Sequence, residues 1–442
     1  MSSAIRTVKF PQSVHLKRRK VYGVIVPDYR ARVADTELAT KMRAVGAVLI
    51  EGPKACGKTA TASRVAATVF DMDRDATARA SIELNPAYLF ERPTPILFDE
   101  WQVAPELWNR VRRAVDDSDR GRGLYLLTGS ATPQHDANRH SGAGRIGVLR
   151  MRPMSLFESG HSDGSVSVAA LLNGEQQPGK DNGLTVPELM KRIVIGGWPD
   201  LLDADESEAR GWIEDYLRQI IEVDIPSFVG RRDPRTLERV LASLGRFVAH
   251  SPAIRTIAAD AGGDRGPIAP STIYSHLDAL DRLRLLDDSE AWQPHMRSRT
   301  RLRTTTTRYF VDPSIGTAAL HVGSDDLLRD LNAAGFHFEA LVVRDLRIYA
   351  QALGGRVDTW RDESGNEVDA IISLPGGRWA AIEIKMSQAE VDTAAAGLRR
   401  FAERIDTARQ GEPAALVVIT ATGSAGQRSD GVHVAPITAL AP

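Results

Sequence analysis

The 442-residue sequence is poor in cysteine, in net charge and in long apolar runs. Its single cysteine, Cys56, excludes an intrachain disulfide and favours a reducing compartment. The formal net charge is −1, so the chain is not a polycation that coats nucleic acid, and any such binding must come from local patches. No apolar run approaches the roughly 18 residues of a transmembrane helix, and the N-terminus lacks a signal-peptide pattern. These absences predict a cytoplasmic protein.

The strongest motif is a phosphate-binding loop between residues 52 and 60. It fits the pattern G-x-x-x-x-G-K-[ST], with an apolar strand expected before it and a helix after it. Glycines let backbone N–H groups wrap phosphates, and the helix N-terminus adds positive potential. We expect Lys58 to reach the β- and γ-phosphates of ATP, and the Thr59 hydroxyl to bind Mg²⁺. The nucleotide would contact the whole loop: Gly52, Pro53, Lys54, Ala55, Cys56, Gly57, Lys58, Thr59 and Ala60.

An acidic pair follows the apolar strand that is predicted at residues 96–98. We expect Asp99 to hold Mg²⁺ through water, and Glu100 to orient or activate the attacking water. A third apolar strand ends in Thr128 and Ser130. Either hydroxyl could sense the γ-phosphate, or both could merely cap the next loop.

Arg145 lies in a Gly-rich stretch just before another apolar strand. A cation in such a place can neutralise transition-state charge, as the arginine fingers of oligomeric ATPases do. Arg139, Arg150 and Arg152 are alternatives for that role. An ordinary surface arginine is an equally good interpretation of Arg145.

An ordered set of motifs makes the chain resemble the AAA-type ATPases of bacteria and archaea that carry a C-terminal domain of unknown function. The set begins with YRARVADTEL, LIEGPKACGKT, ILFDEWQ, LYLLTGSA and GRIGVLRMRPMSLFE, and continues with GGWPD, YFVDPSIG, FEALVVRDL, DTWRDESGNEVDAI and AIEIK. The resemblance implies a P-loop core that binds ATP. It places Arg145 at the family's Gly-Arg position, and the nucleotide site at Gly52, Gly57, Lys58, Thr59, Asp99 and Glu100.

The middle of the chain predicts a linker, a helical lid and a winged helix-turn-helix. Residues 161–183 are rich in Gly, Ser, Asp and Asn, which is typical of a loop or linker. Residues 184–235 predict amphipathic helices, and residues 236–312 predict the winged helix. Four residues would form the exposed face of its second helix: His276, Asp278, Asp281 and Arg282. Because this set is poorly suited to reading a major groove, the module could instead pack one domain against another.

Arginines at alternate positions mark the predicted wing: Arg297, Arg299, Arg301 and Arg303. On a strand they would share one face. Such a row would bind the phosphates of DNA or RNA in a salt-dependent way. A solvated edge strand that resists aggregation is an equally good interpretation.

A hairpin is predicted at residues 367–385, around a Pro-Gly-Gly turn. Centred on Gly376, its register sets Asp369 opposite Glu383, and Glu367 opposite Lys385. Two directly opposed carboxylates repel unless a cation bridges them, and Mg²⁺ suits such a pair. Lys385 could then position or activate an attacking water. An ordinary hairpin with a Glu367–Lys385 ion pair is the alternative.

Glu339 lies on the apolar stripe of a predicted helix, where a carboxylate must find a partner or become protonated. With Asp369, Glu383 and Lys385, it follows the order of acids that resembles metal nucleases of the PD-(D/E)xK group. The resemblance implies a catalytic set of Glu339, Asp369, Glu383 and Lys385, with metal at Asp369 and Glu383. Such folds also persist as inactive binding modules, so cleavage stays open.

The sequence therefore predicts an α/β fold in six segments: a tail (1–20), an AAA-type P-loop ATPase domain (21–160), a linker (161–183), a helical lid (184–235), a winged-helix domain (236–312) and a restriction-endonuclease-like domain (313–442). We expect Mg²⁺-dependent ATP hydrolysis that controls action on DNA or RNA, with a second Mg²⁺ or Mn²⁺ in the last domain. The alternative is an ATP-dependent switch or protein-remodelling factor whose C-terminal domain only binds a partner. A homo-oligomer is compatible with either, and no membrane partner is expected.

Overall fold

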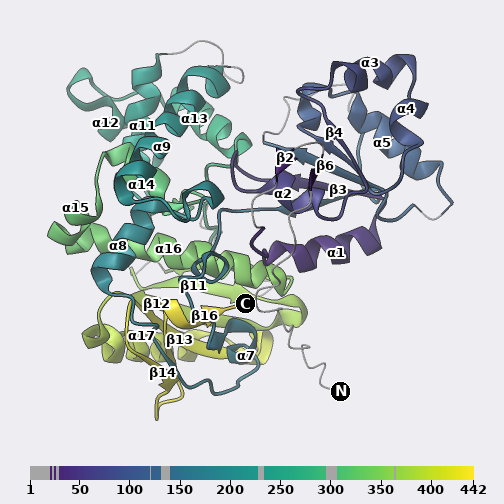
Figure 1. Ribbon diagram of the computed structural model, residues 1–442. Helices are drawn as coiled ribbons and strands as arrows, with labels where there is room; N and C mark the ends of the chain where they lie inside the picture. Colours follow the sequence, from purple (N-terminus) through teal and green to yellow (C-terminus); the bar gives the residue numbers. More distant parts are fainter. Residues whose placement is uncertain are drawn as a thin grey trace. The chain divides into compact units, whose positions relative to one another are not determined.

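The computed structural model describes residues 29–119, 121–130, 140–226, 233–294, 306–362 and 365–442, with the backbone of two short paired strands, β1 (Lys20–Val21) and β2 (Val24–Ile25). The chain divides into two compact units (Figure 1). We call Pro11–Pro153, together with Leu280–Leu285, the N-terminal unit. Met154–Ala279 and Leu286–Pro442 form the C-terminal unit.

The N-terminal unit is built on a parallel five-stranded sheet of order β4-β5-β6-β3-β7. Its strands are β3 (Ala47–Glu51), β4 (Thr68–Asp71), β5 (Ile96–Asp99), β6 (Tyr125–Gly129) and β7 (Ile146–Arg150). The central strands are almost continuously apolar, because helices cover both faces of a parallel sheet. In β3, Val48 and Ile50 pack in one cluster, while Ala47 and Leu49 pack in the other.

Helices cover both faces of this sheet, and they bury the apolar side chains that point alternately to the two faces. Helices α1 (Ala34–Ala44) and α2 (Lys58–Ser63) contribute to the cluster around Val48. The opposite cluster takes residues from three helices and a 3₁₀ turn: α3 (Ala76–Leu84), α4 (Ala87–Phe90), α5 (Leu107–Asp116) and η1 (Trp101–Val103). The sheet is thus fixed between two apolar layers, and its strand ends are held in place for the loops that follow them.

A seven-stranded mixed sheet organises the C-terminal unit, in the order β10-β11-β12-β13-β15-β14-β9. Its strands are β9 (Gly179–Lys180), β10 (Arg356–Arg361), β11 (Glu367–Ser373), β12 (Trp379–Lys385), β13 (Ala415–Thr420), β14 (Ser424–Gln427) and β15 (His433–Pro436). Strands β12, β13 and β15 are parallel neighbours, and the other pairs are antiparallel.

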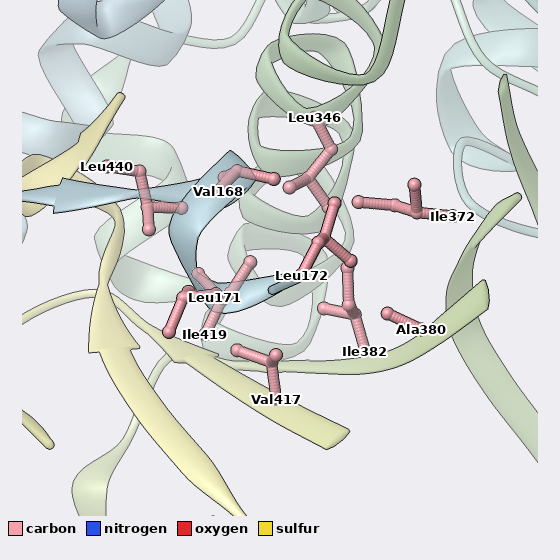
Figure 2. Close-up of a pocket in the computed structure, with 10 residues that line it drawn as sticks. All are labelled: Val168, Leu171, Leu172, Leu346, Ile372, Ala380, Ile382, Val417, Ile419 and Leu440. Carbon is pink, nitrogen blue, oxygen red and sulfur yellow. The ribbon is translucent and has the colours of Figure 1, made fainter. Parts of the chain in front are cut away.

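Helices lie on both faces of this sheet as well. Helix α17 (Val391–Arg404) packs on the face that carries Ile371, Trp379 and Ala381. The long helix α16 (Leu331–Ala352) contributes Leu346 to the other face, where Ile372 and Ile382 lie (Figure 2). The remaining short elements near the sheet are α18 (Thr407–Gln410), η5 (Pro375–Gly377), η6 (Gln388–Glu390) and η7 (Ile437–Ala439).

The segment 161–183, for which we expected a linker, contributes to this sheet domain. Strand β8 (Val166–Ser167) pairs with β16 (Leu440–Ala441), and β9 pairs with β14. Helix α7 (Val168–Leu171) points Val168, Leu171 and Leu172 into the apolar space over the sheet (Figure 2). Its polar residues suggested a loop, but the apolar residues between them are buried and add to the core.

Further helices complete the C-terminal unit. They are α6 (Leu156–Ser159), α8 (Val186–Ile195), α9 (Glu206–Gln219), α11 (Pro234–Arg246), α12 (Ile254–Gly262), α13 (Pro270–Arg282, up to Ala279 in this unit), α14 (Pro313–Leu320) and α15 (Ser324–Arg329), with the short turns η2 (Pro199–Leu201), η3 (Ile220–Asp224) and η4 (Gly263–Arg265). Helices α8, α9, α11 and α14 pack on one another. Among the described residues, none of the helices combines the length and apolarity needed to cross a bilayer.

The segment predicted as a winged helix has three helices, α11 to α13, followed by two antiparallel bridges, Leu286 to Phe310 and Ser289 to Thr307. One expectation for it is wrong. His276 was placed on the exposed face of α13, yet it is buried, whereas Tyr274 is 59% exposed. The turn of the helix points His276 toward the same side as Ile273 and Leu280, so it does not face solvent.

A buried ion network joins distant segments of the C-terminal unit. The Arg344 guanidinium contacts Asp312 at 2.9 Å and Asp345 at 2.8 Å, and none of these side chains is more than 2% exposed. Asp345 also accepts from the Leu156 backbone N–H, and Asp312 from that of Gly197. Burial raises the pKa of Asp345 to about 6. Several motifs that looked independent in the sequence thus meet in one charged cluster of the core.

Candidate functional site

The phosphate-binding loop connects β3 to α2 at the carboxyl end of the sheet. Gly57 has a φ of 99°, in the left-handed region where a side chain is disfavoured. Gly52 is required for a different reason, since a Cβ there would lie 2.4 Å from the carbonyl oxygen of Met151. Both glycines of the motif are therefore explained by backbone geometry, and α2 begins at Lys58 with its N-terminus at the loop.

Lys58 lies folded onto this loop and is only 5% exposed. Its Nζ donates to the carbonyl oxygens of Gly52, at 3.0 Å, and Pro53, at 2.7 Å. These partners are neutral, so they stabilise the ammonium without cancelling its charge. The charge stays available for an anion at the loop.

Asp99 and Thr59 meet at the same edge of the sheet. Asp99 ends β5, and its Oδ1 accepts from the Thr59 hydroxyl at 2.8 Å and from the Thr128 hydroxyl. Burial raises the pKa of Asp99, against the opposing effect of those two hydroxyl donors. A carboxylate and a hydroxyl in contact, with neutral partners only, fit a magnesium ion that binds through one carboxylate, a threonine and water. The predicted metal ligands Thr59 and Asp99 therefore lie together.

Glu100 follows Asp99 and adopts a left-handed backbone, with φ 53° and ψ 43°. Its carboxylate accepts from the Ser130 hydroxyl, at 3.0 Å to Oε1 and 3.3 Å to Oε2, and from the Gln102 side-chain nitrogen. Ser130, expected near the γ-phosphate or as a cap, thus contacts the predicted base, while Thr128 contacts Asp99. The sequence reasoning missed Gln102, although its place two residues after Glu100 was a usable signal.

Arg145 lies apart from this group. It directly precedes β7, whose first residue Ile146 pairs with Ala47 at the start of β3, while the phosphate-binding loop follows the other end of β3. Five strand residues separate those ends, which corresponds to roughly 16 Å. Arg145 instead forms a 2.8 Å ion pair with Asp116. It therefore does not join the nucleotide site of its own chain, and only a role toward another copy stays a prediction.

A second group of chemically active side chains lies on β11 and β12 of the C-terminal unit. The predicted hairpin register is confirmed next to the turn, where Ala370 pairs with Ile382 and three further pairs keep the same sum of residue numbers. The predicted pairs of Asp369 with Glu383 and of Glu367 with Lys385 are not part of this ladder, but the side chains of Asp369 and Glu383 both contact Lys385. Asp369 and Glu383 therefore converge, but Lys385 lies between them. Its Nζ is 3.2 Å from Asp369 Oδ2 and 2.8 Å from Glu383 Oε2.

Glu339 belongs to the same neighbourhood, as predicted from its helical stripe. It lies on α16, and its Oε1 accepts from the Tyr309 hydroxyl at 2.5 Å. Burial and the nearby Asp369 carboxylate raise the pKa of Glu339 well above its ordinary value. Tyr309 is the first residue of the YFVDPSIG motif, but it lies 30 residues before Glu339, and no sequence pattern linked the two side chains.

The charge of this second cluster is largely balanced from within. Burial, then the Asp369 carboxylate, raises the pKa of Glu383 to about 8. Burial is the largest single influence on the pKa of Lys385 and lowers it, but the Asp369 and Glu383 carboxylates together outweigh burial, so the pKa is raised. Within the described part of the chain, no three His, Cys, Asp or Glu side chains are placed to hold a metal ion. The residues as arranged do not fit a second metal, because the Lys385 ammonium takes the position between Asp369 and Glu383.

The predicted nucleic-acid residues Arg297, Arg299, Arg301 and Arg303 lie outside the described residues, as does Arg139. Their role stays a prediction.

Comparisons with known proteins agree with the geometry of the first site. Residues 45–159 match an AAA domain, residues 186–326 match a domain of unknown function (DUF8612), and residues 334–440 match another domain of unknown function (DUF4143). A comparison with curated proteins gives no match. The AAA match confirms the predicted P-loop ATPase domain of AAA type.

Two solved structures show a distant similarity. One is a Walker-type ATPase, PABY2304 of Pyrococcus abyssi, with 14% identity and a TM-score of 0.39, covering 66% of this chain and 96% of that chain. The other is a Drosophila ORC structure bound to DNA, with 10% identity and a TM-score of 0.19, covering 66% and 90%. Both similarities are too distant to add to the assignment.

Proposed function

Because residues 45–159 form an AAA-type P-loop ATPase domain, we propose that the protein binds ATP with Mg²⁺ at this loop and hydrolyses it. The observation that carries the proposal is the contact between Thr59 and Asp99 at the edge where the loop, β5 and β6 end. When bound, Mg²⁺ would neutralise phosphate charge at Thr59 and Asp99. Binding of the phosphates and orientation of the attacking water would be done by groups of the protein itself.

Lys58 would exchange its two carbonyl partners for the β- and γ-phosphate oxygens, a move that breaks hydrogen bonds to uncharged acceptors and forms ion pairs in their place. Glu100 would accept a hydrogen bond from the attacking water and orient it in line with the γ-phosphate. Backbone N–H groups from Gly52 to Ala60 would hold the phosphate chain. The reaction is hydrolysis of the bond between the β- and γ-phosphates by that water.

The test compares Glu100→Gln with wild type. Glu100→Gln keeps the side-chain size and should still bind ATP, while steady-state hydrolysis should fall at least about 100-fold, the usual scale for losing a general base. Phosphate release measures hydrolysis, and equilibrium binding of a fluorescent ATP analogue measures affinity. Full hydrolysis by Glu100→Gln would remove Glu100 from this role. Hydrolysis that survives in Lys58→Ala would contradict the whole site.

For the C-terminal unit we propose that nucleotide state controls an activity toward DNA or RNA. The observation in favour is the convergence of Asp369, Glu383 and Lys385, with Glu339 nearby, which suits recognition of a phosphodiester. Because Lys385 lies between the acids, cleavage would require this ammonium to move first. The rival is a switch or remodelling factor in which the same cluster only stabilises a partner-binding domain.

One assay separates these possibilities. Labelled DNA and RNA are incubated with Mg²⁺ or Mn²⁺, with and without ATP, using wild type, Asp369→Ala and Lys385→Ala. Cleavage that is lost in both variants supports the nuclease proposal. No cleavage by any form, with binding of nucleic acid or protein intact, supports the rival. Equal cleavage by all three forms would indicate a contaminant. Asp392→Ala, an exposed acid in an ion pair with Arg428, serves as the control variant.

A further inference from the structure

Gln102 contacts the predicted base without contacting the loop that binds phosphate. Its amide nitrogen donates to Glu100 Oε2, while the Ser130 hydroxyl reaches Oε1 and Oε2. Side chains of β6 and of the turn after β5 therefore hold the carboxylate from two sides. Because hydrogen bonds to a charged group are stronger than neutral ones, these two donors fix the plane of the Glu100 carboxylate.

The backbone is shaped to bring Gln102 back over Glu100. The left-handed conformation of Glu100, with φ 53°, is strained for a residue other than glycine. It is followed at once by the 3₁₀ turn η1, Trp101–Val103, with Trp101 buried and only 2% exposed. Strain of this kind persists only where the surroundings impose it. Here the buried Trp101 anchors the turn, and the turn directs Gln102 toward Glu100.

Strand β6 leaves room for this arrangement at one position. A Cβ on Gly129 would lie 2.7 Å from Gln102 Oε1 and 2.9 Å from Trp101 Nε1. Both distances are too short for a real contact, so a side chain at residue 129 would displace the amide. Gly129 therefore permits β6 to approach closely, with the Gln102 side chain against its backbone and the Ser130 hydroxyl alongside.

The position of the Gln102 amide destabilises the folded protein. Its Oε1 is buried and, among the described residues, has no hydrogen-bond partner. A buried acceptor without a partner destabilises the folded state, because it has lost its hydrogen bonds to water. An apolar side chain of the same length would fill the space without that cost. The only hydrogen bond that the amide makes in the described structure is the one to Glu100.

We propose that Gln102 is a positioning residue for ATP hydrolysis, which holds the Glu100 carboxylate so that a free lone pair faces the attacking water. The inference rests on the proposed hydrolysis with Glu100 as the base. Gln102 acts only through Glu100 and does not touch the nucleotide. A carboxylate that rotates freely would present its oxygen to the water for a fraction of the time, and misplacement of about 1 Å can cost about 100-fold in rate.

The decisive variant is Gln102→Met, which keeps the side-chain length and removes both amide atoms. Because the substitution also removes the buried Oε1 that has no hydrogen-bond partner, the variant should be at least as stable as wild type. Thermal unfolding measures this stability. We expect kcat to fall about 10- to 100-fold, with KM and the affinity for ATP unchanged. Gln102→Glu should lose at least as much, because it places a second carboxylate beside Glu100.

A double-mutant cycle separates positioning from a merely structural effect. If Gln102 acts through Glu100, Gln102→Met should have no further effect in a Glu100→Gln background. Thr68→Val is the matched control: Thr68 lies on β4, outside the site, and the substitution removes its 2.8 Å hydrogen bond to the Pro93 carbonyl, so kcat should be unchanged.

The proposal is overturned if folded Gln102→Met has the kcat of wild type, changes KM alone, or loses as much rate in the Glu100→Gln background as in wild type. In those cases Glu100→Gln still abolishes hydrolysis, and the proposed function stands. If instead Glu100→Gln hydrolyses ATP normally, or wild type hydrolyses none, both the function and this inference fail.

Discussion

The two acidic clusters of this protein differ in what contacts their carboxylates. At the end of β5, Asp99 and Glu100 accept hydrogen bonds from hydroxyl and amide groups, which carry no charge. On β11 and β12, Asp369 and Glu383 share the ammonium of Lys385. Neutral donors orient a carboxylate without cancelling its charge, whereas an ammonium does both. Among the described residues, the carboxylates of the first cluster therefore keep their charge, as the proposed Mg²⁺ site requires, whereas the second cluster already contains a cation.

The lysines of the two clusters, Lys58 and Lys385, show the same contrast. Lys58 is bound by carbonyl oxygens of its own loop, so leaving them for a phosphate costs little. Lys385 is paired with two carboxylates that are each about a tenth exposed, and moving it would leave those charges unbalanced. A lysine that must move during catalysis is better held by neutral groups. This difference favours the first cluster as the site of chemistry.

The largest expected effect tests the two lysines directly. Lys385→Met should lower the free energy of unfolding by about 2–4 kcal/mol, because it strands two carboxylates, with some relief from solvent at this partly exposed site. Lys58→Met should change stability by about 1 kcal/mol or less and abolish ATP hydrolysis. Urea unfolding of both variants provides the measurement. Equal destabilisation by the two substitutions would contradict the comparison.

The next effect concerns the cation at the first cluster. Mg²⁺ with ATP at 100 times its dissociation constant should stabilise the wild-type protein by about 2.7 kcal/mol. Thr59→Val should lose most of this gain, because the hydroxyl next to Asp99 is removed. Thr61→Val, two residues along the same helix, is the matched control, as its hydroxyl contacts Tyr29 instead. Thermal unfolding with ATP, with and without Mg²⁺, distinguishes them; an identical Mg²⁺ response in both variants would oppose the assignment.

The ion network around Arg344 predicts a smaller, pH-dependent effect in the C-terminal unit. The pKa of Asp345 is about 6 in the folded protein, above its ordinary value of 3.8, so the folded state binds the proton more tightly. Stability from this group is therefore largest below pH 3.8 and declines as the pH rises toward 6, by about 1–2 kcal/mol. Asp345→Asn cannot titrate, and its unfolding free energy should lack that decline. If the unfolding free energy changed equally with pH in wild type and variant between pH 4 and 6, the raised pKa of Asp345 would be contradicted.

The smallest effect is expected for Arg145. Its ion pair with Asp116 is about 40% exposed on average, and such pairs contribute less than about 1 kcal/mol. Since the residue lies at the far end of the sheet from the loop, Arg145→Ala should leave hydrolysis by a dilute monomer within about twofold of wild type. A loss that depends on protein concentration would instead place Arg145 in the site of a neighbouring copy.

The sequence predicted two kinds of site feature: those formed by contiguous residues, and those that follow from the two-residue repeat of a β-strand. The loop from Gly52 to Thr59 is contiguous, and the end of an apolar strand located Asp99 and Glu100. The two-residue period of a strand was enough to set the register next to the turn, from Ala370–Ile382 to Ser373–Trp379. None of these features requires knowledge of how distant segments pack.

Contacts between distant segments were not predictable in this way. Tyr309 reaches Glu339 across 30 residues, and Asp116 reaches Arg145 across 29, without any local pattern that connects them. The cation at the second cluster was also misjudged, because spacing showed that Lys385 shares a face with the acids but did not show that its ammonium lies between them. The linker prediction for residues 161–183 relied on composition, which does not register that a few apolar residues are buried against a sheet.

The pairing of β8 with β16 has a consequence for how the C-terminal unit forms. Leu440 and Ala441 pair with Val166 and Ser167, so residues about 275 positions apart become neighbours. Closing a loop of that size is entropically costly and is rewarded only when the partner strand is present. In the folded unit, the segment from α6 to β9 is therefore held by contacts that span most of the chain, and contacts of such long range slow folding relative to local ones.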